Sequence, residues 1–143
     1  MRPMISRAGI LGVALTLLAC GGGDDSFSPT AETVAGDYTA SVFTLTSSVG
    51  TTDLLALGAT VAVSLEPGGT TTGRLFVPGG AEDGSDLDED LAGTWSLSGN
   101  TVRFNQSSDT FIQNADFSAG PGNLIGEGVF GGGTVRVVLE KSK

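Results

Sequence analysis

Residues 93–106 read Gly-Thr-Trp-Ser-Leu-Ser-Gly-Asn-Thr-Val-Arg-Phe-Asn-Gln, and this stretch decides the fold class. Two short runs, 93–97 and 101–106, are joined by a polar turn that contains glycine. In the second run Val102 and Phe104 alternate with polar residues, which is the two-residue period of a strand with one buried face. Strands separated by so short a turn pair in antiparallel fashion, so the stretch predicts a β-hairpin.

The same pattern recurs on both sides of this hairpin. Six further runs rich in β-branched and aromatic residues cover 38–45, 60–65, 71–77, 111–118, 124–130 and 134–140. Most links are short, which suits hairpins and excludes helical crossovers, and no window beyond one turn at 53–58 has a helical period. Eight such strands leave two exposed edges unless the sheet closes. The sequence therefore predicts an all-β fold, a single small antiparallel up-and-down barrel of about eight strands, with a β-sandwich as the alternative.

The N-terminal residues have the composition of a secretory signal peptide: positive charge, a short apolar run over 10–19 and a small residue before the cleavage point. The run is shorter than the roughly 20 apolar residues of a membrane-spanning helix. Leu17-Leu18-Ala19-Cys20 resembles the lipobox of bacterial lipoproteins. The resemblance implies a lipoprotein signal peptide over 1–19 and a lipid anchor on Cys20 in the bacterial cell envelope. Because Gly21 rather than Asp follows, the outer membrane is the expected location.

The residues that follow divide into a tether and a domain. Residues 20–33 are small, polar and rich in glycine, a composition that predicts a flexible tether. The barrel domain is expected over 34–143.

Composition excludes two classes of function. After cleavage the chain has five basic and sixteen acidic residues, a net charge of −11, so we expect no binding to nucleic acid. The chain has no histidine, which removes Ser-His-Asp catalysis and the usual zinc sites, and we expect no enzyme activity.

A further resemblance concerns the barrel itself. Gly36-Asp37-Tyr38 opens the first strand where lipocalins place Gly-x-Trp, and a long loop over 46–58 follows, where that family has its lid loop. Residues 34–141 thus resemble a lipocalin-type (calycin) barrel, although the only Gly-x-Trp, Gly93-Thr94-Trp95, opens the fourth strand. The resemblance implies that the barrel binds a small hydrophobic or amphipathic ligand.

Aromatic side chains are the candidates for contact with such a ligand. An eight-stranded barrel is just wide enough to be filled by side chains or to hold one small ligand. Gly126 and Gly128 lie on the inward face of their run and predict free volume there. The five residues expected to line the ligand site are Tyr38, Phe76, Trp95, Phe104 and Phe130.

Charged residues suggest two further features. Arg74, Arg103 and Arg136 lie near the middles of strands, where an inward guanidinium would pair with an anionic head group and an outward one would be solvated. Between the third and fourth strands the acidic run 82–90 carries Asp86, Asp88 and Asp90 in alternation.

The acidic run has two interpretations. Its alternating carboxylates could converge on calcium as in the first half of an EF-hand loop, but Leu91 stands where that loop needs glycine. The other interpretation is a solvated connection whose charge blocks edge pairing.

Apart from the covalent lipid no cofactor is expected. The functional alternative to ligand binding is a structural or interaction lipoprotein, a solid barrel whose acidic loop contacts envelope partners.

Overall fold

The computed structural model describes residues 27–108, 110–130 and 132–143. The expected signal peptide and Cys20 lie outside these residues. In the described part of the chain, no helix has the length and apolar character to cross a membrane.

Strands dominate the described chain, with two one-turn α-helices and one 3-10 turn between them. In chain order the elements are α1 (Ala31–Val34), β1 (Gly36–Ser47), β2 (Gly50–Asp53), η1 (Leu55–Leu57), β3 (Thr60–Leu65), β4 (Thr70–Val77), β5 (Leu87–Asp90), β6 (Gly93–Ser98), β7 (Thr101–Gln106), α2 (Phe111–Asn114), β8 (Asp116–Gly120), β9 (Asn123–Phe130) and β10 (Gly133–Lys141).

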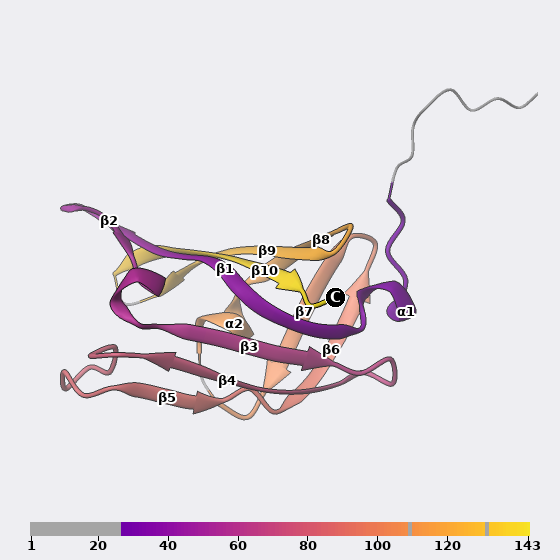
Figure 1. Cartoon of the computed structure of the whole chain (residues 1–143), viewed down its shortest axis with the longest axis horizontal. Coiled ribbons are helices and arrows are strands. Elements are labelled where there is room, and N and C mark those ends of the chain that lie inside the picture. Colours follow the sequence, from indigo (N-terminus) through magenta and orange to yellow (C-terminus); the bar gives the residue numbers. More distant parts are fainter. Residues whose placement is uncertain (1–26, 109, 131) are drawn as a thin grey trace, which may run out of the picture.

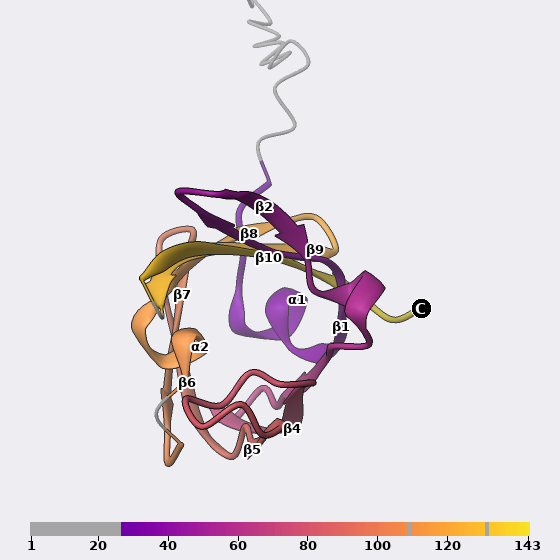
Figure 2. The same ribbon diagram turned by 90° about the vertical axis from the view of Figure 1, so that its left-hand side faces the viewer.

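Eight of these strands form a closed antiparallel barrel. The order around the barrel is β1-β3-β4-β6-β7-β8-β9-β10, and β10 pairs with β1 to complete the ring. Figure 2 looks along the ring from one end, and Figure 1 shows it from the side. The predicted all-β up-and-down barrel is confirmed, and the sandwich alternative is wrong because a sandwich has no such closing ladder.

The strand β1 contains a bulge that determines which side chains reach the core. Its register on β10 shifts between Ala40 and Val42, so that Ser41 is an extra residue. Side chains alternate across a strand, and one extra residue reverses the faces beyond it. Tyr38 before the bulge and Phe43 after it are therefore both buried. In a regular strand these two side chains would lie on opposite faces.

Two strands lie outside the ring. β2 pairs with the second half of β1, inside the predicted long loop 46–58. β5 pairs with the second half of β4, from Val77–Leu87 to Arg74–Asp90, and β6 continues on β4 in the same register at Thr71–Gly93. β5 and β6 thus form one bent partner for β4. The acidic run was expected to be a connection between strands, which is wrong for residues 87–90, because they form β5.

The segment 111–118 is not a single strand, which corrects the sequence prediction. Its first part is α2, and β8 begins only at Asp116. Phe111 and Ile112 are consecutive and both buried, which a strand with one solvated face does not allow. The helix turn packs both side chains inward beside a place where β7 and β8 share only two residue pairs.

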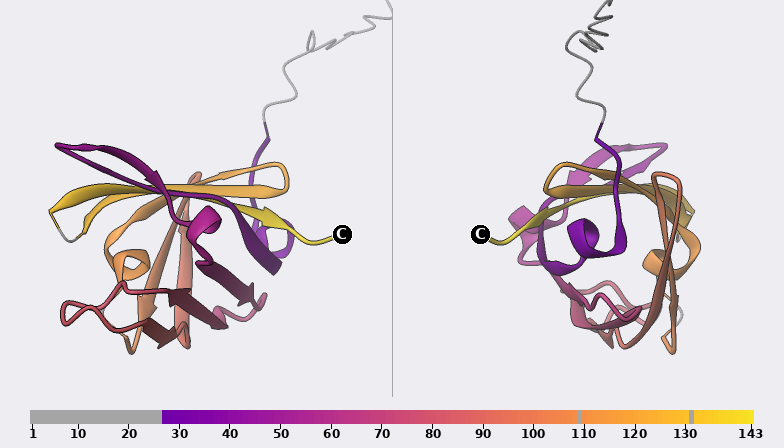
Figure 3. Two further views of the ribbon diagram at one scale, coloured as in Figure 1. Left: turned by 60° about the vertical axis from the view of Figure 1, so that its left-hand side comes forward. Right: turned by 90° about the vertical axis from the view of Figure 1, so that its right-hand side faces the viewer.

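One end of the barrel is closed by the N-terminal segment. Figures 2 and 3 show α1 lying across this end, and Figure 1 shows the C-terminal residues there as well. Val34 of α1 is buried, its carbonyl accepts a 2.6 Å hydrogen bond from the Tyr38 hydroxyl, and Phe27 packs on the core. Burial raises the pKa of the Tyr38 phenol. Phe27 and Ala31 thus pack against the barrel core, although both lie within the residues expected to form the tether.

The middle of the barrel is filled by side chains. Phe104 and Phe117 meet edge to face with ring centroids 5.2 Å apart. The Phe117 ring occupies the space beside Gly126, since a Cβ on that glycine would lie 2.5 Å from the ring. The free volume predicted at Gly126 is therefore absent. Among the described residues, the free space of the apolar interior lies toward the end opposite α1.

The bulge at Ser41 generates a test within one strand. We expect Val42→Thr to change the free energy of unfolding by no more than about 0.5 kcal/mol, because Val42 is 37% exposed on the outer face. Phe43→Ala should cost about 3–5 kcal/mol, because that ring is buried. Chemical denaturation measures both. A strand without the bulge would reverse the order of the two effects.

Candidate functional site: an apolar pocket at the open end

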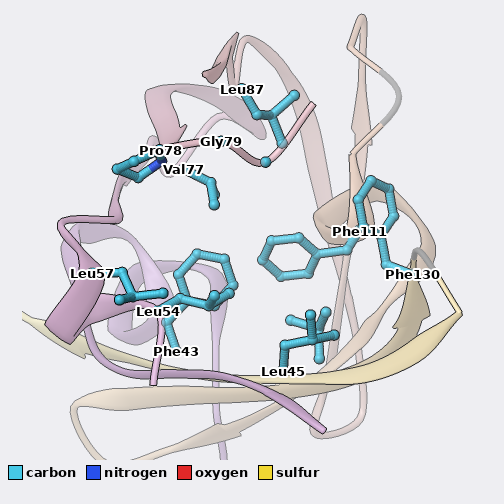
Figure 4. A pocket seen from close by; sticks show the side chains of 12 residues that line it. Phe43, Leu45, Leu54, Leu57, Val77, Pro78, Gly79, Leu87, Phe111 and Phe130 are labelled. Carbon is cyan, nitrogen blue, oxygen red and sulfur yellow. The ribbon is translucent and has the colours of Figure 1, made fainter. Parts of the chain in front are cut away.

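An apolar pocket of about 340 Å³ opens at the end of the barrel opposite α1. Figure 4 shows its side chains converging from strands, the 3-10 turn and α2. This volume lies at the lower end of the range of about 300–1,000 Å³ for small-molecule sites. The lining residues are Phe43, Leu45, Leu54, Leu57, Val77, Pro78, Gly79, Gly80, Leu87, Phe111, Phe130 and Val135.

Three phenylalanine rings form one wall of the pocket. Phe43 from β1 and Phe111 from α2 have ring centroids 5.3 Å apart, and Phe111 and Phe130 meet at 6.3 Å. Phe43 and Phe111 are buried, while Phe130 at the end of β9 is half-buried. In Figure 4 the first two rings face one another at the centre of the site. The wall is buried where it meets the core and partly exposed at its rim.

The opposite wall depends on the 3-10 turn. The Asp53 carboxylate accepts hydrogen bonds from the backbone N–H groups of Leu55 and Ala56, which starts the turn after β2. The Leu54 N–H donates to the Phe43 carbonyl at 2.8 Å and holds the turn against β1. Leu57 is 60% exposed, so one lip of the pocket presents an apolar side chain to water.

A tight turn after β4 forms the third side. Val77-Pro78-Gly79-Gly80 closes with a bond from the Gly80 N–H to the Val77 carbonyl, and Gly79 has φ +65°. Proline followed by a residue of positive φ is typical of a type II turn. The Gly79 N–H also donates to the Asp86 carboxylate at 3.0 Å. This bond ties the acidic loop to the pocket.

Of the five aromatic residues expected to line a ligand site, Phe130 lines this pocket. Trp95 lies toward the closed end, where its indole N–H donates to the Glu66 carbonyl at 2.8 Å. Phe104 belongs to the filled middle of the core, and Tyr38 to the closed end. Phe76 follows the inward Leu75 and shares the outer face with the exposed Thr60, its partner in β3. Phe43 and Phe111 line the pocket but were not among the five expected residues, because their positions depend on the bulge and on α2.

All three arginines in the described residues point outward and form ion pairs. Arg74 holds Asp88 with two hydrogen bonds, one of 2.6 Å from Nε. Arg103 Nε lies 2.7 Å from an Asp116 oxygen, and Arg136 lies 3.8 Å from Glu127. Such exposed pairs contribute little to stability. Their importance here is that none of the three lines the pocket.

Two of the three residues predicted for calcium have other partners. Asp86 accepts the Gly79 N–H, Asp88 pairs with Arg74, and Asp90 is exposed on the same outer face of β5. Across residues 27–143, omitting 109 and 131, no three side chains of a type that binds metals gather in one place. Calcium binding stays a prediction from the sequence.

Comparison with known proteins gives no match. No family model fits the chain, and neither a curated protein nor a solved structure is significantly similar to it.

The Arg74–Asp88 pair predicts a pH dependence. The hydrogen bond from Arg74 lowers the pKa of Asp88. A lowered folded-state pKa means that the pair stabilises the fold above the unfolded pKa of about 3.9 and stops doing so as pH falls through the folded value. NMR titration should give Asp88 a lower midpoint in the protein than in Arg74→Gln. The matched change Arg103→Gln should leave that midpoint in place; if it moves equally, the pairing is not its cause.

Proposed function

We propose that this protein is a lipid-anchored lipoprotein of the bacterial cell envelope whose lipocalin-like barrel binds a small hydrophobic or amphipathic ligand. The observation that carries the binding role is the apolar pocket at the open end. Its volume of about 340 Å³ suits a small molecule, and side chains of phenylalanine, leucine and valine supply most of its surface.

The arrangement of the core supports a ligand site over a packing defect. The middle of the barrel is filled, with Phe117 and Leu124 fully buried, while the pocket lies at one end and opens to solvent. An open, concave and mainly apolar pocket is the usual form of a small-molecule site. A ligand that covers the exposed Leu57 side chain at the lip would remove apolar surface from water, which favours binding.

The anchor rests on the sequence. The apolar run before Cys20, the lipobox-like Leu17-Leu18-Ala19-Cys20 and the glycine-rich residues after it support acylation of the only cysteine and an outer-membrane location. A chain that enters the barrel beside α1, at the closed end, leaves the pocket open to the surrounding water.

Filling the pocket should abolish binding. Val77 points into the site in Figure 4, and Val77→Phe adds a ring there. We expect this variant to bind N-phenyl-1-naphthylamine, an uncharged apolar dye, at least about tenfold more weakly, equivalent to about 1.4 kcal/mol. Dye fluorescence measures the affinity, and thermal melting confirms that the variant is folded.

The matched control is Val129→Phe, because Val129 is 78% exposed and is not among the pocket residues. It makes the same chemical change and should leave dye binding unaltered. Equal weakening by both variants, or no dye binding by the unmodified protein, would contradict the proposed pocket.

Substitution of Cys20 tests the anchor. We expect the full chain produced in a bacterium with lipoprotein processing to incorporate radiolabelled palmitate and to sediment with membranes. Cys20→Ser should lose the label, because acylation needs the thiol. Label retained in this variant would show that the anchor is elsewhere or absent.

A further inference from the structure

Charge is distributed unevenly along the barrel. The described lysines, Lys141 and Lys143, lie at the closed end, and the Lys141 ammonium donates to the Thr33 carbonyl next to α1. The arginines lie on the outer wall and each is paired with a carboxylate. Among the described residues, no cationic side chain lines the apolar pocket or the surface directly beside it, where carboxylates lie.

The carboxylates at the open end lie directly beside the pocket. Glu82 and Asp83 line a hollow that shares Gly80, Leu87 and Phe130 with the apolar pocket. A ligand whose apolar part fills the pocket would place its other end in this hollow. The two surfaces are thus parts of one amphipathic site.

The acidic loop is held in place by its own hydrogen bonds. The Asp83 carboxylate accepts both the hydroxyl and the backbone N–H of Ser85, and these bonds lower the pKa of Asp83. The Ala81 N–H donates to the Ser85 carbonyl at 3.0 Å, and Asp86 is tied to Gly79. These bonds hold the Asp83 carboxylate within the loop that lines the hollow beside the pocket.

We propose that the ligand is a cationic amphiphile, with its apolar part among the phenylalanine rings and its positive head group beside Glu82 and Asp83. This inference rests on the proposed binding function and adds the charge of the ligand. An anionic head group in the same place would face carboxylates with no cation to neutralise it. Fixed like charges at a site reject such ligands, and opposite charges speed and strengthen binding.

The test compares three probes with a ten-carbon chain, each at concentrations where it is dissolved as single molecules: decyltrimethylammonium, decanoate and decanol. Isothermal titration calorimetry at about 0.01 M salt should show the cation binding at least about tenfold more tightly than the anion, with decanol between them. At about 1 M salt, where the screening length falls to about 3 Å, the difference should shrink to about twofold.

A double variant locates the effect. Glu82→Gln with Asp83→Asn should reduce the preference for the cation several-fold, while the amide oxygen of the new side chain can still accept the hydrogen bonds from Ser85. The control, Glu32→Gln with Glu140→Gln, removes two negative charges from the closed end and should leave the preference intact.

The outcomes separate the two proposals. Equal binding of cation and anion, or tighter binding of decanoate, overturns the head-group inference and leaves the pocket proposal standing. A preference lost equally in both double variants also overturns it, since net charge alone would then be responsible. Failure of all three probes to bind overturns the pocket proposal and the inference together.

Discussion

β1 pairs with β10 from Tyr38–Lys141 to Thr46–Thr134, and this ladder joins the two ends of a sheet that would otherwise be open. Closure removes two exposed edges and encloses the core. The bulge within the same ladder turns Phe43 toward the pocket after Tyr38 has faced the closed end. Both ends of the barrel interior thus depend on the register of one strand pair.

The two ends are built by different means. At the closed end, α1 and the buried Tyr38 and Trp95 fill the opening, and each aromatic polar group has a backbone partner. At the open end the strands continue past the ring as the β1–β2 and β4–β5 hairpins, and mostly apolar side chains meet between them. The hairpins lengthen the wall and leave an amphipathic mouth above a solid core.

Local alternation was sufficient to predict the regular strands. The predicted runs 60–65 and 101–106 coincide with β3 and β7, because each has one apolar and one polar face. Alternation did not predict the strands that depend on tertiary contacts. The acidic segment 87–90 has a poor composition for a strand, yet it forms β5 because it pairs with β4 and because Arg74 pairs with Asp88. Of the aromatic residues predicted from the sequence to line a ligand site, only Phe130 lines the pocket. Strand register and α2 determine which aromatic side chains lie near the open end, and local alternation does not reveal either.

The first and last described residues lie at the same end of the barrel, linked through the Ser142 N–H to the Asp37 carbonyl and through Lys141 to Thr33. A group joined directly to Phe27 or Lys143 would therefore meet the domain at the closed end. A group joined directly to either of these residues would leave the open end, with its apolar pocket, unobstructed.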